Sequence, residues 1–379
     1  MDRRLATVLA GALGIGAVLA VAPLVAGRDR GASTPPPSGP PTANSTPGPS
    51  GDGSTSTAPA APTTTAPRTG SGQPVTFAFG GDVHFEGNLR WRLSDPGRAL
   101  AGVAPLLASA DVAMVNLETA ITERGTPQTK AYNFRAPATA FTALRSAGVD
   151  VTTMANNHGI DYGPVGLADS LAARAGAGIP VLGIGADATD AYRPWRTTVR
   201  GERIAVFAAT DVLDDWLIAA WTATDAQGGL ASAKGTSLAR LLDGIRAVRR
   251  SNDTVVVYLH WGAEGQVCPT PRQRELADAI VAAGADIVVG SHAHRVEGAG
   301  RLGTALIGYG LGNFVFYNES GESGRTGVLR VTATGRRIDA WEWVPARISG
   351  GIPRALGEPA RTQDLAVFGQ RRACAGLAP

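Results

Sequence analysis

Short apolar runs alternate with Ala- and Leu-rich stretches along the chain from Pro74 onward. The apolar runs predict β-strands: VTFAF, DVAMVNLE, DVTTMA, IPVLGIG, RIAVFAA, TVVVYLH, DIVVG, TALIGYG and NFVFY. The stretches between them predict helices over residues 95–108, 138–147, 164–177, 237–250 and 271–283. Strands that are apolar on both faces and alternate with helices are typical of parallel sheets covered by helices.

The last strands, GVLRVTA and RIDAWEWV, follow one another without an intervening helix. This change of pattern predicts that they form an antiparallel second sheet. The expected architecture is therefore an α/β fold in which two sheets pack together with helices outside. We expect this domain to occupy residues 74–345, with residues 346–379 as a C-terminal tail that either packs on the domain or extends from it.

The first 73 residues differ in composition from the rest of the chain. Arg3 and Arg4 precede an uncharged run over residues 5–27, long enough to span a bilayer as an apolar helix, which takes about twenty residues. Residues 1–27 are thus expected to be a signal anchor or a cleaved signal peptide, with the rest of the chain exported. Residues 28–73 are almost all Ser, Thr, Pro, Gly and Ala, which predicts a disordered linker.

Net charge and cysteine content limit the partners and metal ligands to be expected. The net charge of the 379-residue chain is only +3, and its arginines are scattered, so a nucleic-acid partner is not expected. The two cysteines, Cys268 and Cys374, lie in the exported part. Either they form a disulfide or they stay apart, and the sequence does not decide between these alternatives. Neither has the spacing of a metal ligand.

All five histidines lie where an apolar run ends, which in open α/β sheets is the edge where ligands bind. His292 and His294 are two residues apart, so on an extended backbone their rings would point the same way. A lone histidine after a strand is more often a hydrogen-bonded structural residue. Five of five at strand ends, accompanied by acidic and amide side chains, instead predict a metal site with the ligands Asp82, His84, Glu118, Asn157, His260, His292 and His294.

Seven ligands without a thiolate suit two divalent ions of Mn, Fe or Zn rather than a structural zinc site. Two ions roughly 3.5 to 4 Å apart would share a carboxylate and a bridging water. His158, the remaining histidine, is the candidate general acid. Four further residues are candidates for binding substrate or supporting the site, and each has an ordinary structural interpretation as well: Arg135, Asp161, Glu264 and Asn313.

Several linked motifs carry a family resemblance: GDVHFEG, NLETAIT, FRAP, ANNHGIDYG, HWGAEG, GSHAHRV and GLGNFVF. Over about residues 74–320 the chain resembles the CapA family of poly-γ-glutamate capsule biosynthesis proteins, within the calcineurin-like metallophosphoesterase superfamily. The resemblance implies a four-layer α/β/β/α sandwich, extracytoplasmic placement and a role with an anionic surface polymer.

The resemblance also implies a distribution of ligands between two metals. Asp82, His84 and His294 would hold the first ion, and Asn157, His260 and His292 the second. The bridging residue is an aspartate in the broader superfamily, whereas this chain offers Glu118, whose longer side chain would alter the spacing of the metals.

Three functions are compatible with these features. One is a surface-tethered metallohydrolase that cleaves phosphoester or amide bonds in an envelope polymer. Another is a non-hydrolytic subunit that binds poly-γ-glutamate or a similar polyanion, together with membrane synthase or export partners. The third is a metal-stabilised structural domain. Only the hydrolase requires His158 as a proton donor.

Overall fold

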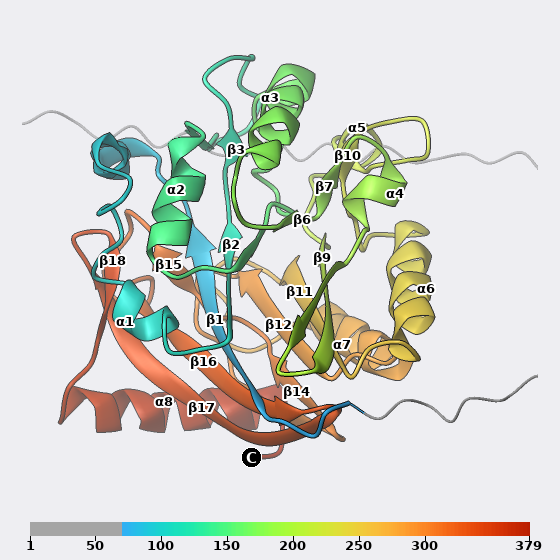
Figure 1. Ribbon diagram of the computed structural model, residues 1–379. Helices are drawn as coiled ribbons and strands as arrows, with labels where there is room; N and C mark the ends of the chain where they lie inside the picture. Colours follow the sequence, from blue (N-terminus) through green and yellow to red (C-terminus); the bar gives the residue numbers. More distant parts are fainter. Residues whose placement is uncertain (1–69) are drawn as a thin grey trace, which may run out of the picture. The chain divides into compact units, whose positions relative to one another are not determined.

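The computed structural model describes residues 70–379 (Figure 1). The expected anchor or signal peptide over residues 1–27 and most of the expected linker over residues 28–73 lie outside the described residues. Within residues 70–379 no helix combines the length and the apolar character needed to cross a membrane.

Two large sheets organise the described residues. The eight-stranded first sheet has the order β18-β17-β16-β1-β2-β5-β6, with β15 also paired to β1. Its strands are β1 (Val75–Val83), β2 (Val112–Leu117), β5 (Val151–Thr153), β6 (Val181–Leu182), β15 (Asn313–Val315), β16 (Arg325–Thr334), β17 (Arg337–Ser349) and β18 (Ile352–Ala355). The six-stranded second sheet has the order β13-β14-β12-β11-β9-β8. Its strands are β8 (Trp195–Val199), β9 (Glu202–Thr210), β11 (Thr254–Trp261), β12 (Ile287–His292), β13 (Ala299–Leu302) and β14 (Ala305–Gly308).

Smaller elements complete the fold. Two short pairs are formed by β3 (Ala120–Ile121) with β4 (Arg135–Ala136) and by β7 (Ile184–Gly185) with β10 (Gly229–Leu230). The helices are the 3-10 helix η1 (Gly87–Ser94), α1 (Ala104–Leu107), α2 (Thr139–Ser146), α3 (Gly163–Ala175), α4 (Ala188–Ala191), α5 (Ile218–Trp221), α6 (Ser237–Arg249), α7 (Pro271–Ala283) and α8 (Ala360–Ala375).

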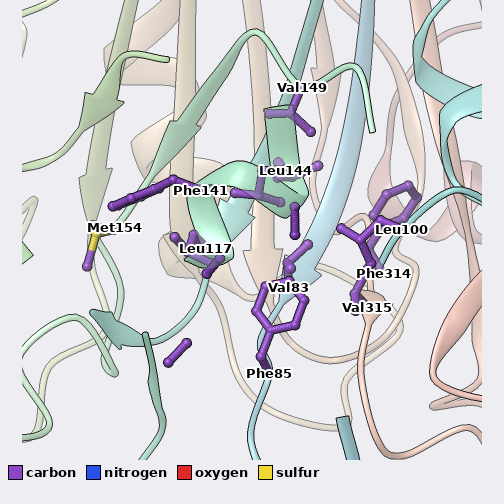
Figure 2. Close-up of a cluster of buried hydrophobic side chains, with 14 of the residues drawn as sticks. Val83, Phe85, Leu100, Leu117, Phe141, Leu144, Val149, Met154, Phe314 and Val315 are labelled. Atoms are coloured by element: carbon purple, nitrogen blue, oxygen red, sulfur yellow. The ribbon is translucent and has the colours of Figure 1, made fainter. Parts of the chain in front are cut away.

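Alternating residues of the central strands face two different cores. In β11, Val256 and Tyr258 belong to the cluster between the two sheets, whereas Val257 and Leu259 belong to the cluster beneath α6 and α7. In β1, Phe77 likewise faces the other sheet. The outer face of the first sheet packs against α2, whose Phe141 and Leu144 belong to one buried cluster with Val83 and Leu117 (Figure 2). Both faces of these strands are therefore buried, as their continuous apolar sequences predict.

The expectation of a mixed α/β fold with two sheets is confirmed, but the assignment of the last strands was wrong. β16 pairs antiparallel with β1, and β17 with β16, so both join the first sheet. The second sheet is built mainly from parallel pairs, among them β11 with β9 and with β12. Pairing with β1 bridges more than two hundred residues of sequence, and local pattern carries no information about such a partner.

The prediction of a helix over residues 95–108 was also wrong. This segment forms turns, and only Ala104–Leu107 is α-helical. Gly97 and Gly102 disfavour a continuous helix, and Pro105 is tolerated because it lies in the first turn of α1. The other four expected helices are present, and α7 has the expected limits because a capping box of Thr270 and Gln273 begins it and Gly284, at φ 119°, ends it.

The C-terminal segment packs on the domain. β17 runs through the expected boundary at residue 345, and α8 lies against β13 and β17. Phe368 of α8 stacks on Trp343 with ring centroids 4.9 Å apart. Cys268 and Cys374 form a disulfide, which settles the alternative that the sequence left open.

Candidate metal centre

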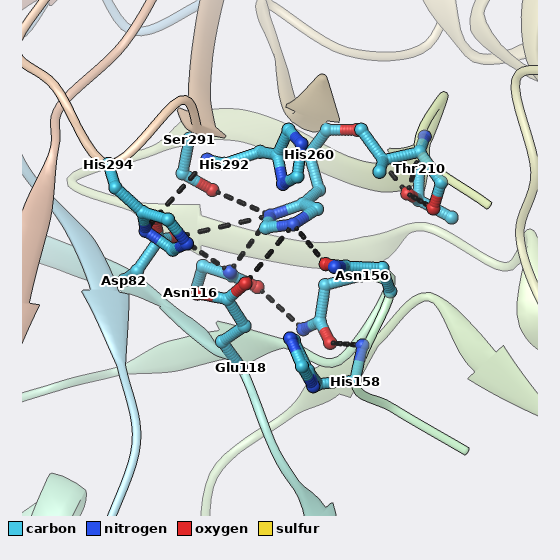
Figure 3. Close-up of polar contacts among 12 residues, drawn as sticks. Asp82, Asn116, Glu118, Asn156, His158, Thr210, His260, Ser291, His292 and His294 are labelled. Atoms are coloured by element: carbon cyan, nitrogen blue, oxygen red, sulfur yellow. Dashed lines mark hydrogen bonds and ion pairs between the residues drawn. The ribbon is translucent and has the colours of Figure 1, made fainter. Parts of the chain in front are cut away.

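The end of β1 is shaped by two glycines that precede Asp82. The pairing of β1 with β2 shifts register between Phe79 and Asp82, so Gly80 and Gly81 form an irregularity in the strand. A Cβ atom at Gly81 would lie 1.8 Å from the carbonyl oxygen of Gly312, so only glycine fits there. This close approach places the Asp82 carboxylate at the carboxyl end of the first sheet, where β2 and the strands of the second sheet also deliver polar side chains (Figure 3).

Two overlapping groups of potential ligands meet at this edge. Glu118 lies with His260 and His292 in one group and with Asp82 and His294 in the other, and within each group the potential ligand atoms are within 4.8 Å of one another. Glu118 follows β2 directly, His260 lies in β11 and His292 ends β12. All five residues are among the ligands expected from the sequence, and the structure brings them together with Glu118 shared between the groups.

Several buried ligand atoms of these groups have no hydrogen-bond partner and are therefore available to a cation. Glu118 is fully buried, and neither of its carboxylate oxygens has a hydrogen-bond partner. Nδ1 of the buried His292 also lacks one. A buried carboxylate without hydrogen bonds is energetically costly unless a positive charge compensates it. Carboxylate oxygens and imidazole nitrogens are ligands for Mn, Fe and Zn, so the residues present fit divalent metal ions.

The electrostatics of the groups lead to the same conclusion. Burial and the neighbouring Asp82 raise the pKa of Glu118 well above its ordinary value. Burial opposes ionisation of Asp82 too, but His294, His260 and Asn116 together outweigh it and hold the pKa of Asp82 below its usual range. Burial lowers the pKa of His260 to about 3, which leaves its ring neutral, the form in which imidazole binds a metal. A bound cation would reverse the penalty on Glu118.

Neighbouring amides and a hydroxyl orient these ligands. Asn116 Nδ2 donates to Asp82 Oδ1 at 2.8 Å and lies 3.2 Å from His260 Nδ1. Asn156 Nδ2 in turn donates to Asn116 Oδ1 at 2.9 Å (Figure 3). Asn157 Oδ1, an expected ligand, is 2.7 Å from His260 Nε2, and Ser291 Oγ is 3.1 Å from His260 Nδ1. Networks of this kind fix the orientation of metal ligands.

Sequence reasoning missed Asn116 and Asn156. A signal for Asn116 was available, because it lies two residues before Glu118 and therefore on the same face of the strand.

The backbone of His292 and His294 is not the extended strand that the sequence predicts. The sequence spacing predicts that both lie on one extended strand, but β12 ends at His292 and the chain then bends. Their φ angles are 98° and 52°, in the left-handed region that non-glycine residues rarely adopt. Such conformations persist only where the surroundings over-determine them, and they are enriched at functional sites. The two rings, 6.0 Å apart, therefore enter different ligand groups.

A buried ion-pair network of Asp161 and Lys130 holds the His158 ring. Its Nδ1 contacts Asp161 Oδ2, and Lys130 Nζ donates to Asp161 Oδ1 at 2.7 Å. Phe134 donates its backbone N–H to the same carboxylate and stacks on the His158 ring at 4.0 Å. Burial, reinforced by Lys130, holds the pKa of His158 well below its ordinary value. Lys130 stands alone in a polar loop, and nothing in the sequence singled it out.

His84 lies beside the two ligand groups but belongs to neither. Its Nδ1 accepts a hydrogen bond of 3.0 Å from the backbone N–H of Glu86, and its buried Nε2 has no hydrogen-bond partner. The ring stacks on Phe134 at 4.6 Å and meets Phe316 edge-on at 4.1 Å.

Of the four remaining candidate residues, two line a cavity of about 440 Å³ beside the ligand groups. Glu264 and Asn313 line it, together with His158 and His294. Asp161 is fully buried, so it reaches the cavity only through His158. Arg135 does not line this cavity. Its guanidinium lies over the ring of Tyr162 at 4.8 Å.

Comparison with known proteins identifies relatives of this chain. "Capsule biosynthesis protein CapA" of Bacillus anthracis is 33% identical over 215 residues, which cover 56% of this chain and 51% of that protein. "PGA biosynthesis protein CapA" of Bacillus subtilis (strain 168) is 32% identical over 223 residues, covering 56% and 55%. The chain therefore spans about half the length of the curated relatives it matches.

A crystal structure of a hypothetical protein from Thermus thermophilus is similar to this chain with a TM-score of 0.47 and 20% identity, and the match covers 72% of this chain and all of that one. The family described as "Bacterial capsule synthesis protein PGA_cap" matches residues 76–318, well over half of the chain and all of the residues that form the ligand groups. The resemblance that the sequence motifs carry is thus confirmed, and the chain belongs to this capsule synthesis family.

Proposed function

We propose that this chain is a metal-dependent hydrolase that processes an anionic capsule polymer, poly-γ-glutamate, outside the cytoplasm. The observation that carries the proposal is the buried Glu118 carboxylate, which has no hydrogen-bond partner and is shared by two ligand groups. The names of the two CapA relatives support capsule synthesis as the setting and poly-γ-glutamate, abbreviated PGA, as the polymer. A four-layer α/β/β/α sandwich of the metallophosphoesterase type and contact with membrane synthase or export partners belong to the same proposal.

The two ligand groups would hold the metal, with Asn157 and His84 beside them. Divalent ions bound there would polarise a carbonyl or phosphoryl oxygen and lower the pKa of a bound water. Asp161 accepts a hydrogen bond from the Nδ1–H of His158, which leaves the lone pair of the neutral ring on Nε2. Nε2 of His158 is therefore the atom that takes up and returns a proton, while Lys130 keeps Asp161 paired.

A non-hydrolytic polymer-binding subunit is the second candidate. The observation that favours it is the low pKa of His158, because a ring that stays neutral near pH 7 is a poor proton donor. Both candidates need the ligand groups, and only turnover separates them.

The test uses the full chain loaded with manganese and measures amines released from poly-γ-glutamate, polymer binding and metal content. Wild type is expected to release amines. His158→Ala is expected to lose about a hundredfold or more of that rate, while it keeps its metal and binds polymer. Full turnover in His158→Ala would show that the assigned proton carrier is wrong. Binding without turnover in wild type would favour the second candidate.

A further inference from the structure

The cavity beside the ligand groups combines aromatic walls with two opposite charges. It is lined by Tyr132, Phe134, His158, Glu264, Gly265, His294, Arg295, Asn313, Phe316, Tyr317, Asn318 and Ser323. Tyr132, one of these lining residues, is 65% exposed. The cavity of about 440 Å³ falls within the size range of small-molecule sites.

Arg295 brings unused hydrogen-bond donors to this cavity. Its Nη1 donates to the carbonyl oxygen of His294 at 2.8 Å and to Ser323 Oγ at 2.6 Å. These two bonds fix the guanidinium at the cavity wall, and among residues 70–379 its Nε and Nη2 atoms have no partner. An anchored guanidinium with two free donors is suited to bind a carboxylate.

Glu264 supplies the opposite charge from the loop after β11. It is exposed, and within the described part of the chain it forms no ion pair, either with Arg295 or with another cation. Its charge nevertheless acts on Glu118 and His294, which places it close to the ligand groups. The cavity therefore presents an acceptor for a cation and donors for an anion that do not neutralise each other.

We propose that this cavity binds the amino-terminal residue of a γ-linked glutamyl chain, with the α-carboxylate on Arg295 and the α-ammonium on Glu264. Every residue of such a polymer has a free α-carboxylate, but only the first also has a free ammonium, because the amines of all others are in amide bonds. A site with both charges therefore distinguishes the amino end from the interior. Phe316 and Tyr317 also line the cavity and would offer an apolar surface to the methylene groups of the side chain.

The inference deepens the proposed hydrolase function and rests on it for the reaction. In a γ-linked residue the carbonyl carbon lies three C–C bonds from the α-carbon, a reach of about 4 Å. With the α-carbon held at Arg295 and Glu264, we propose that the carbonyl reaches His294 and His158, which line the same cavity. Hydrolysis breaks the amide C–N bond, water oxygen bonds to the carbonyl carbon, and a water proton passes through His158 Nε2 to the leaving nitrogen. The products are one free glutamate and a chain with a new amino end.

The probes that test this are the dipeptide γ-glutamyl-glutamate and its N-acetylated form, titrated calorimetrically into the full chain loaded with manganese. Arg295→Gln and Glu264→Gln are expected to weaken binding of the dipeptide about tenfold or more, since each removes a charge-assisted contact. Acetylation should cause a similar loss in wild type and little further loss in Glu264→Gln. The matched controls Arg250→Gln and Glu342→Gln change exposed residues that do not line the cavity and should bind as wild type does.

Equal binding of the free and acetylated dipeptides would overturn the inference, and so would unchanged binding in Arg295→Gln. Dipeptide binding with the expected pattern but no release of glutamate would refute the hydrolase and leave the end-specific site standing. Cleavage of acetylated polymer at the same rate as free polymer would refute the end-specific site and leave the hydrolase standing.

Discussion

Replacing Cys268 and Cys374 together with serine is expected to lower the free energy of unfolding by about 4.8 kcal/mol. The disulfide joins residues 106 positions apart, and the loss of chain entropy that a cross-link of this length imposes on the unfolded state gives that magnitude. Cys374 is exposed, so serine there sacrifices little packing. A loss of this size is a large fraction of the 5–15 kcal/mol that is typical of whole domains.

Other contacts limit how far the C-terminal helix can move when the disulfide is removed. Arg274 donates to the backbone carbonyls of Cys374 and Ala375, and Arg371 donates to the carbonyl oxygen of Val296 at 2.7 Å. The double variant should therefore fold with α8 in place, and the loss should come from the unfolded state.

Urea denaturation followed by tryptophan fluorescence measures this loss, with wild type in dithiothreitol as the matched control. The reduced wild type and the double variant should unfold at the same midpoint, well below that of oxidised wild type. Because the chain has only these two cysteines, a thiol titration should find none free in the oxidised protein. A difference below about 1 kcal/mol would show that the cross-link contributes little stability, and two titratable thiols would show that the disulfide does not form.

Three further predictions follow from single sites. Gly81→Ala should destabilise the fold by roughly 1–3 kcal/mol or more and weaken manganese binding, because its Cβ would meet the Gly312 carbonyl beside Asp82; thermal unfolding with and without manganese checks this. Burial raises the pKa of Glu297 to about 7 from 4.5, so this group alone should cost wild type up to about 3 kcal/mol of stability as pH rises from 4.5 through 7. Urea midpoints across that range should therefore fall less in Glu297→Gln than in wild type. Lys130→Met should cost about 3 kcal/mol in the same assay by leaving Asp161 without its cation, and adding Asp161→Asn should restore part of it.

Much of the site could be predicted because parallel strands deliver their carboxyl ends to one edge. Asp82, Glu118, His260 and His292 each follow an apolar run, and the structure gathers them at that edge. The same rule could not find Lys130, because it lies in a loop and its ion pair with Asp161 is visible only in the folded chain.

The sequence could not predict long-range strand pairing or the local backbone conformation at the site. Whether β16 would pair with β1 or within a separate sheet depends on residues more than two hundred positions apart. The left-handed backbone of His292 and His294 follows from tertiary constraints, since their sequence alone favours an extended strand. Arg295 is adjacent to His294, but its hydrogen bond to Ser323 is visible only in the folded chain.

The metal content of the full chain, measured after purification in manganese, tests whether the two ligand groups hold metal. Close to two ions per chain are expected in wild type and in the exposed control Glu342→Gln. Glu118→Ala should hold far fewer, because this carboxylate is shared by both ligand groups. Absence of bound metal in wild type, or unchanged metal content in Glu118→Ala, would contradict a metal centre built on this carboxylate.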